Sequence, residues 1–312
     1  MRIGLVGAGW VMDFHARAAL EHPRAELVAA ANWREPSLRR LAGRHGIPRV
    51  TTDWRALAAD AEVDAVVIAT PNALHAPQAI AFLEAGKHVL VEKPMAPTVA
   101  EADAMVAAAR GSGAFLMVAH CWRFHPDVQA LRARVEAGDL GEIVKTRGYG
   151  VHARWGPSGW FTDPALAGGG ALLDMGVHAI DTARYLLGDP EPVRVSAAVG
   201  TRYGDYAVDD DAVLLITWSN RTNSVVESGW WQPQAGGLEA DTELYGTAGY
   251  ARVWELTEPP PGYEHCTQPM YSAQLAEFVD AVTAGRQPRP SGEDGRMVVG
   301  IVEQAYASAT GA

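Results

Sequence analysis

Short apolar runs and Ala-rich amphipathic stretches alternate through the first 120 residues of the chain. The apolar runs have the length of buried strands, and the stretches between them have the spacing of helices. We expect strands at Arg2–Val6, Ala25–Ala31, Arg49–Thr51, Asp64–Ala69, His88–Val91 and Ala114–Ala119. Predicted helices over Glu35–His45 and Ala73–Ala85 are each followed by a glycine, which tolerates a left-handed C-terminal turn. This alternation predicts a Rossmann-type, doubly wound parallel sheet in a first domain over residues 1–120.

The pattern changes after Arg123. We expect helices at Asp127–Ala137 and Asp174–Leu187, a strand pair around Ile143–His152, strands at Val193–Thr201, Ala212–Trp218, Ser224–Trp231 and Thr242–Tyr245, a loop at Glu258–Gly262, and closing helices at Ser272–Ala284 and Glu293–Ala309. Strands joined by short polar turns pair antiparallel. The pattern therefore predicts an α+β domain over residues 121–312, with a large open, mainly antiparallel sheet. An uncovered sheet face is a hazard that self-association removes, so we expect a homodimer or homotetramer.

Composition narrows the class of protein. The 312 residues are 48% hydrophobic, enough for two domains, but the apolar runs are too short to span a membrane and no secretion signal is visible. Cys121 and Cys266 support neither a disulfide framework nor a metal site. The net charge of −11, without a basic run, disfavours nucleic acid as a partner. These features predict a soluble cytoplasmic protein with a small-molecule partner.

The segment Gly7-Ala8-Gly9-Trp10-Val11-Met12 leaves a predicted strand and opens a helix. Gly7 permits a tight turn, and Gly9 lets the backbone approach a pyrophosphate, which the helix N-terminus favours. Met12 stands where a third glycine is usual, which would loosen the packing of helix on strand. We expect this turn, with Trp10 and Val11, to bind NAD or NADP; a plain strand-to-helix turn is the alternative.

The end of the second strand bears on the choice of dinucleotide. Enzymes of this fold that bind NAD carry an acidic residue there, which binds the adenosine ribose. Here the sequence is Asn32-Trp33-Arg34, so no carboxylate opposes a 2′-phosphate, and Arg34, Arg39 or Ser37 could bind one. We expect these strand-end residues to favour NADP, with NAD possible; a solvated Arg34 is the alternative.

Two further polar groups follow strands, at the edge where parallel sheets bind ligands. Thr70-Pro71-Asn72 and His75 follow one strand, and Glu92-Lys93-Pro94 follows the next. We expect them to contact the cofactor, and Lys93 also to hold a substrate hydroxyl. The alternatives are a helix cap for Asn72 or His75 and a solvated surface position for Lys93.

A flexible glycine run, Gly168–Gly170, leads into a predicted helix that carries Asp174 and His178. Residues four apart share one helical face, so both side chains could reach one substrate hydroxyl. His178 would take the proton of that hydroxyl, and Asp174 would orient the hydroxyl or tune the base. The alternative is that Asp174 only caps the helix.

The order of these motifs resembles that of the Gfo/Idh/MocA oxidoreductases, the family of glucose-fructose oxidoreductase and inositol 2-dehydrogenase. The similar segments are Ala69–His75, Glu92–Pro94, Arg123 with Pro126, Gly168–His178 and Ser291–Arg296, so the resemblance covers essentially the whole chain. Met12 and Asn32 depart from the family pattern. The resemblance implies hydride transfer between a nicotinamide and a hydroxyl or keto carbon of a sugar, inositol or related polyol.

By the same resemblance Lys93, Asp174 and His178 form the catalytic set, with His178 as acid/base and Lys93 touching both nicotinamide ribose and substrate. We further expect Arg123 and Trp160 to contact cofactor and substrate, and Tyr271 to contact substrate, since aromatic faces suit a sugar ring. Two alternatives remain open. One is an enzyme whose tightly bound cofactor supports cleavage of a C–O bond through transient oxidation, and the other is a dinucleotide sensor without activity.

Overall fold

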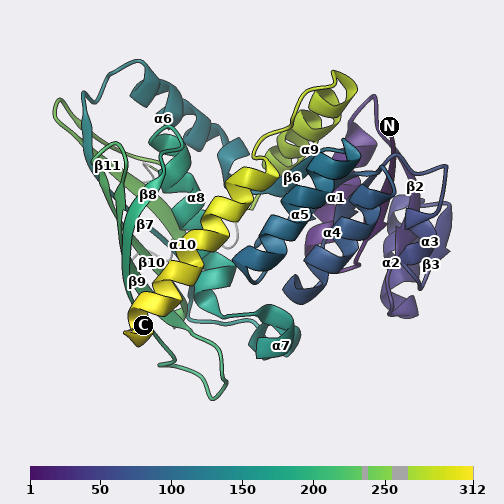
Figure 1. The fold of residues 1–312 in the computed structure, drawn as a ribbon, viewed down its shortest axis with the longest axis horizontal. Coiled ribbons are helices and arrows are strands. Elements are labelled where there is room, and N and C mark those ends of the chain that lie inside the picture. The colour runs from purple at the N-terminus through teal and green to yellow at the C-terminus, as the bar shows by residue number, and fades with distance from the viewer. Residues whose placement is uncertain (234–237, 255–265, 312) are drawn as a thin grey trace. The chain divides into compact units, whose positions relative to one another are not determined.

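The structure, a computed structural model, describes residues 1–233, 238–254 and 266–311. Its contacts divide the chain into two compact units (Figure 1). The first contains Met1–Ala119 and Gln268–Arg296, and the second contains His120–Thr267 and Met297–Ala312. The predicted loop at Glu258–Gly262 lies outside the described residues.

The first unit is built on a six-stranded sheet in the order β3-β2-β1-β4-β5-β6, with every neighbouring pair parallel. Its strands are β1 (Arg2–Val6), β2 (Glu26–Ala31), β3 (Arg49–Thr51), β4 (Ala65–Ile68), β5 (His88–Glu92) and β6 (Leu116–Ala119). The central strand β4 is apolar throughout and fully buried, as expected for a parallel sheet covered on both faces. All six predicted strands and the doubly wound parallel sheet are confirmed.

Helices connect these strands. They are α1 (Trp10–Glu21), α2 (Glu35–His45), α3 (Arg55–Ala58), η1 (Asn72–Leu74), α4 (His75–Glu84) and α5 (Val99–Ser112). The α2 helix has the predicted bounds and ends at Gly46, which adopts a left-handed conformation with φ 65°. The helix predicted over Ala73–Ala85 is divided into the short turn η1 and the helix α4.

The helix α9 (Gln268–Thr283) departs from the predicted division of the chain, because it packs within the first unit. The ring of Tyr271 stacks on Phe14 of α1 with centroids 4.8 Å apart. Gln268 Nε2 donates to the Phe14 carbonyl oxygen, and Ser272 donates to Glu21. The boundary expected at residue 120 is close to the observed change of unit, but residues 268–296 were expected in the second domain. A single run of sequence carries no signal that a later helix returns to an earlier sheet.

The second unit contains a six-stranded sheet in the order β12-β11-β7-β10-β9-β8. Its strands are β7 (Ile143–Ala153), β8 (Pro192–Gly200), β9 (Asp211–Trp218), β10 (Asn223–Gln232), β11 (Ala240–Gly246) and β12 (Tyr250–Arg252). Every pair is antiparallel except β10 with β7. The large, mainly antiparallel sheet is therefore confirmed, but the strand pair expected around Ile143–His152 is one long strand.

The second unit also contains helices, and those at Leu172–Gly176 and Val177–Leu186 contact the sheet. The helices of this unit are η2 (Cys121–Phe124), α6 (Pro126–Glu136), η3 (Gly159–Thr162), α7 (Pro164–Ala167), the π-helical turn η4 (Leu172–Gly176), α8 (Val177–Leu186) and the last part of α10 (Gly292–Thr310). The β9 residues Leu214 and Ile216 share a buried core with Ile180 and Ile301. Their neighbours alternate to the opposite face, where Leu215 is 49% exposed. None of the described helices is long and apolar enough to cross a membrane.

Candidate active site

The glycine turn at the end of β1 has the geometry that close approach of a ligand requires. Gly7 has φ 109°, and a Cβ atom there would lie 2.2 Å from the carbonyl oxygen of Ala69. Its N–H donates to the Ala31 carbonyl oxygen, which fixes the turn against β2. Gly9 precedes α1 without a side-chain cap, and the space around its α-carbon is open. Gly9 therefore contributes no capping side chain at the N-terminus of α1, and a helix N-terminus favours a phosphate.

The side chains after this turn have different environments. Trp10 is 57% exposed, and its ring meets Phe14 edge to face with centroids 5.9 Å apart. Val11 is half-buried, whereas Met12 is fully buried in the core. The expectation that Met12 loosens the packing is wrong, because its flexible side chain fills the interior. Its side chain is also withdrawn from any ligand, so only its backbone remains a candidate.

At the end of β2, Asn32, Trp33 and Arg34 form an exposed polar and aromatic surface. The Asn32 amide donates to the Arg34 carbonyl oxygen, and the Arg34 guanidinium lies 4.5 Å from the centre of the Trp33 ring. Two other candidates for a phosphate have local partners: Arg39 pairs with Glu35, and the Ser37 hydroxyl accepts from Arg40. Arg34 is therefore the cation best placed for a 2′-phosphate on this strand end.

His75 connects two of the predicted site segments, at the ends of β4 and β5. Its ring is buried, with Nε2 2.8 Å from the Thr70 carbonyl oxygen and Nδ1 2.9 Å from the Pro94 carbonyl oxygen. Burial lowers the pKa of His75, against the opposing effect of the two carbonyl oxygens. His75 thus links the two segments through backbone carbonyl oxygens, and its expected contact with a cofactor stays a prediction.

The remaining residues of these segments also lie at the carboxyl edge of the first sheet. Thr70 donates to Gln78 of α4, which orients its side chain, and Pro71 is half-buried beside it. Asn72 is buried at the start of η1. These positions agree with the edge at which parallel sheets bind ligands.

Glu92 and Lys93 end β5 with a buried carboxylate beside a half-buried lysine. Glu92 Oε1 lies 2.7 Å from His15 Nε2 of α1, and Glu92 Oε2 accepts from the backbone N–H of Lys93 at 3.1 Å. Glu92 is thus fixed at both oxygens, and its expected contact with the cofactor stays a prediction. Sequence reasoning did not find His15, although a histidine on the helix that follows the glycine turn was visible.

In the second unit, Asp174 lies in the π-helical turn that precedes α8. Its Oδ2 atom accepts from Trp230 Nε1 at 3.0 Å and lies 3.1 Å from His152 Nε2. Such turns occur often at functional sites because they widen a helix locally. Residues of β7 and β10 therefore hold the Asp174 carboxylate. Capping of the helix, the alternative that the sequence allowed, does not account for these two contacts.

His152 lies between two carboxylates, Asp174 on one side and Glu239 on the other. Its Nδ1 atom is 3.7 Å from Glu239 Oε2, and its ring lies against Trp155 with centroids 3.7 Å apart. Burial alone would lower the pKa of His152, but the two carboxylates outweigh it and raise that pKa. Burial would raise the pKa of Glu239, but its bonds from His152, Ala153 and Trp155 lower it. The cluster thus favours the protonated form of the His152 imidazole and the ionised form of Glu239.

Sequence reasoning missed His152, Glu239 and Trp230. A signal for His152 existed: it shares one face of β7 with Thr146, Gly148 and Gly150, and this face is buried. A histidine at the end of such a face needs a polar partner. Nothing in the sequence indicated that Glu239 and Trp230, from other strands, would be its neighbours or those of Asp174.

His178 lies on the first turn of α8, where it is 5% exposed. Trp122 stacks on its imidazole, with centroids 4.5 Å apart and planes 14° apart. The neighbouring residue Arg123 is buried and donates from Nε and Nη2 to Asp181 and from Nη2 to Asp189. Arg123 is therefore part of an internal ion-pair network that joins η2 to α8, and its expected contact with cofactor and substrate stays a prediction.

Trp160 and Tyr271, the two aromatic residues predicted to contact the substrate, belong to different units. Trp160 lies in η3 of the second unit, half-buried and stacked on Phe161 with centroids 3.9 Å apart. Tyr271 lies in the first unit, buried between Phe14 and His15. Tyr271 thus packs on His15, the partner of Glu92. It belongs to the first unit, and not to the second domain in which it was expected.

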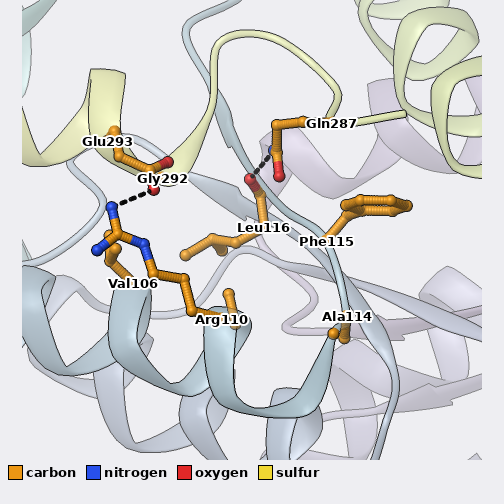
Figure 2. A pocket seen from close by; sticks show the side chains of 10 residues that line it. Val106, Arg110, Ala114, Phe115, Leu116, Gln287, Gly292 and Glu293 are labelled. Carbon is orange, nitrogen blue, oxygen red and sulfur yellow. Dashed lines mark hydrogen bonds and ion pairs between the residues drawn. The ribbon is translucent and has the colours of Figure 1, made fainter. Parts of the chain in front are cut away.

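A surface pocket of about 190 Å³ in the first unit lies apart from these residues (Figure 2). Arg110 of α5 and Glu293 form an ion pair of 2.9 Å at its edge, and Gln287 donates to the Leu116 carbonyl oxygen. Leu116 begins β6, so the pocket is at the amino end of the strand, whereas ligands of parallel sheets bind at the carboxyl ends. We assign no function to it.

Comparison with known proteins covers both units. A family model described as an oxidoreductase family with an NAD-binding Rossmann fold matches residues 1–120, and one for the GFO/IDH/MocA C-terminal domain matches residues 128–252. The rhizopine catabolism protein MocA of Rhizobium meliloti is 33% identical over 306 residues, which cover 97% of this chain and 93% of that protein. Inositol 2-dehydrogenase of Rhizobium meliloti strain 1021 is 30% identical over 331 residues, with coverage of 99% and 96%.

A solved structure shows the same fold at similar length. Levoglucosan dehydrogenase in complex with NADH and levoglucosan has a TM-score of 0.88 and 28% identity, with coverage of 100% of this chain and 97% of that one. The chain therefore belongs to the Gfo/Idh/MocA family of NAD-binding oxidoreductases.

Proposed function

We propose that this oxidoreductase interconverts a secondary alcohol and a ketone on a sugar, inositol or related polyol. The observation that carries the proposal is the arrangement in the second unit, where Asp174 is held by Trp230 and His152 while His178 lies on Trp122. Fixed carboxylate and imidazole groups are the components of acid–base chemistry on a hydroxyl. Relatives named for inositol, levoglucosan and xylose support this substrate class.

The residues at the carboxyl edge of the first sheet fit a nicotinamide dinucleotide. The Gly7–Gly9 turn and the uncapped start of α1 would hold the pyrophosphate, and the Thr70–Asn72 segment would line the adjoining part of the cofactor. When bound, the nicotinamide supplies the carbon that takes up or gives back a hydride. The protein itself supplies binding, orientation and proton transfer.

The proposed preference is for NADP over NAD. Arg34 is exposed beside Trp33, and Asn32 leaves the strand end without a carboxylate. Arg34 would pair with a 2′-phosphate, which only NADP carries. A relative named as an NADP-dependent xylose dehydrogenase shows that the family includes this choice of cofactor.

We propose Lys93, Asp174 and His178 as the catalytic residues. In the oxidising direction His178 takes the proton from the substrate hydroxyl as the carbon loses its hydride, so that a C–H and an O–H bond give one C=O bond. Asp174 remains ionised and orients the hydroxyl, and Lys93 donates a hydrogen bond to the substrate oxygen. The reducing direction returns the same proton from His178.

The proposed assembly is a homo-oligomer formed through the open sheet of the second unit. Val213 and Leu215 of β9 are each more than two-fifths exposed, on the face opposite the buried Leu214 and Ile216. Apolar side chains on an uncovered sheet face are stabilised by a second copy of the same face. A Leu215→Glu variant should shift the mass in light scattering towards that of a monomer, whereas an unchanged mass would reject this interface.

Isotope tracing tests the proposed reaction. A panel of sugars and inositols with deuterium on the carbinol carbons is incubated with the protein and NADP⁺, and the reduced cofactor is analysed by mass spectrometry. Deuterium on the cofactor with one equivalent of ketone is expected. Cleavage of a C–O bond without net reduction of cofactor would support the transient-oxidation alternative, and cofactor binding without any product would support the sensor.

A further inference from the structure

Asp209 binds the start of the turn that carries Asp174, although it precedes a different strand, β9. Its Oδ1 atom accepts from the N–H of Gly170 at 2.7 Å, and Oδ2 accepts from the N–H of Leu172 at 2.8 Å. Its backbone oxygen accepts from the N–H of Ala171 at 2.8 Å. One residue thus binds three consecutive N–H groups at the entry to the π-helical turn, where no local side chain provides a cap.

The final helix holds this carboxylate in place. The Tyr306 hydroxyl of α10 donates to Asp209 Oδ1 at 2.6 Å. Burial and the nearby Asp209 carboxylate raise the pKa of Tyr306 well above its ordinary value, so the hydroxyl stays protonated and remains a donor. Val302 and Ala305, which precede Tyr306 on α10, belong to the core of the second unit, and Tyr306 packs against this core, which makes it a rigid support.

The glycines before the turn are explained by this contact. A Cβ atom at Gly170 would lie 1.8 Å from the Asp209 carbonyl oxygen, and one at Gly169 would lie 2.3 Å from the Tyr306 hydroxyl. The glycine run therefore permits close approach of Asp209 and Tyr306. This differs from the flexible segment that the sequence predicts, because each of the following N–H groups has a fixed partner.

The contact continues directly into the candidate catalytic residues. The Gly170 carbonyl oxygen accepts from the backbone N–H of Asp174 at 2.9 Å, so the residue bound by Asp209 also fixes Asp174. His178 follows within the first turn of α8. A shift of the Gly170–Leu172 backbone would move both side chains, and small displacements of catalytic groups are costly to rate.

We propose that Asp209 and Tyr306 are positioning residues for the reaction, holding the turn that sets the orientation of Asp174 and His178. The proposal rests on the function proposed above, since it assumes that Asp174 and His178 perform the chemistry. It differs from a purely structural role in one respect. Loss of either residue should lower kcat many-fold, while KM and the melting temperature change little.

The test uses Tyr306→Phe, Asp209→Asn and a matched control in the same unit, Ser224→Ala. Tyr306→Phe removes only the hydroxyl, and Asp209→Asn replaces one of the two acceptor oxygens with a donor that opposes an N–H group. Ser224→Ala also removes a buried hydrogen-bond network, in which Ser224 Oγ lies 2.6 Å from Thr146 Oγ1 and 2.7 Å from Trp218 Nε1. That network has no part in the turn.

Steady-state kinetics and hydrogen–deuterium exchange are measured on all three variants and on Asp174→Asn. We expect kcat to fall about tenfold in Tyr306→Phe and about a hundredfold in Asp209→Asn, with KM nearly unchanged. Deuterium uptake should rise in peptides that cover residues 168–178. In Ser224→Ala the melting temperature should fall while kcat and this uptake stay at the wild-type values.

The outcomes separate this proposal from the function on which it rests. Unchanged kcat and unchanged uptake in Tyr306→Phe, with activity lost in Asp174→Asn, would overturn the positioning role and leave the function intact. Full activity in Asp174→Asn would overturn both the function and the role. If Asp209→Asn does not fold, Tyr306→Phe decides, since its uptake in residues 168–178 must rise for the proposal to stand.

Discussion

The indole ring of Trp122 lies flat on the imidazole of His178, with ring centroids 4.5 Å apart and planes 14° apart. Trp122 is almost fully buried and also meets Trp254 edge to face. Trp122 follows β6, whereas His178 begins α8, so residues distant in the sequence restrict the rotation of the proposed acid/base. This contact and those of Asp174 lead to the following predictions.

Two replacements of Trp122 should distinguish its contribution to core packing from its effect on the orientation of the His178 ring. Trp122→Leu should destabilise the protein by about 3 kcal/mol, since it leaves a cavity in the core. It should also lower kcat, because the imidazole loses its flat support. Trp122→Phe keeps an aromatic face and should retain most of the activity at the same substrate concentrations. Equal kcat in Trp122→Leu and wild type would show that the stacking has no part in catalysis.

Trp230→Phe should isolate the hydrogen bond to Asp174. The change keeps a buried aromatic ring but removes the Nε1 donor, which lies 3.0 Å from Asp174 Oδ2. A hydrogen bond to a charged group contributes about 1.5–3 kcal/mol, so kcat/KM should fall about tenfold or more. Trp218→Phe is a suitable control, because Trp218 donates to Ser224 in the same sheet. A matching loss of kcat/KM in the control would count against a specific effect on Asp174.

The stability of the protein should depend on pH through His152. The folded-state pKa of this residue is raised above 6.5, so its contribution is complete below that pH and is lost as the pH rises through the folded-state pKa. The difference in melting temperature between wild type and His152→Gln should therefore be largest near pH 6 and shrink towards about pH 9. A difference that grows with pH would show that the folded state holds His152 neutral.

Arg34→Ala should affect the two cofactors differently. Energy transfer from tryptophan to the reduced nicotinamide reports the Kd for NADPH and for NADH, without a substrate. We expect the Kd for NADPH to rise about tenfold or more and that for NADH to change little, because only NADPH carries the 2′-phosphate. Arg39→Ala, which removes an arginine paired with Glu35, is the control and should leave both unchanged. A stronger effect on NADH would reject the assignment of Arg34.

The parallel sheet could be predicted well because its signals are local. Buried strands such as β4 are apolar throughout, and Gly46 ends α2 as the sequence indicates. The motifs that end at Asn72, Lys93 and His178 lie at strand ends or on a helix start, as expected. These features depend on short stretches of sequence, where propensity and burial agree.

The partners of the candidate residues could not be predicted, because they come from distant parts of the chain. His152 and Trp230 reach Asp174 from two different strands, and Tyr306 reaches Asp209 from the final helix. Arg123 pairs with Asp181 and Asp189, which the sequence did not link to it. Their pairing is decided by the packing of strands and helices in three dimensions, where a single sequence carries little information.

The proposed oxidation of a sugar or polyol is tested most directly by the absorbance of reduced nicotinamide. The protein is incubated with NADP⁺ or NAD⁺ and a panel of sugars and inositols. We predict a steady rise with at least one polyol. His178→Asn should lower that rate by about a hundredfold or more while its Kd for NADPH remains that of the wild type. An undiminished rate in His178→Asn, or no reduction of either cofactor with any member of the panel, would contradict the account.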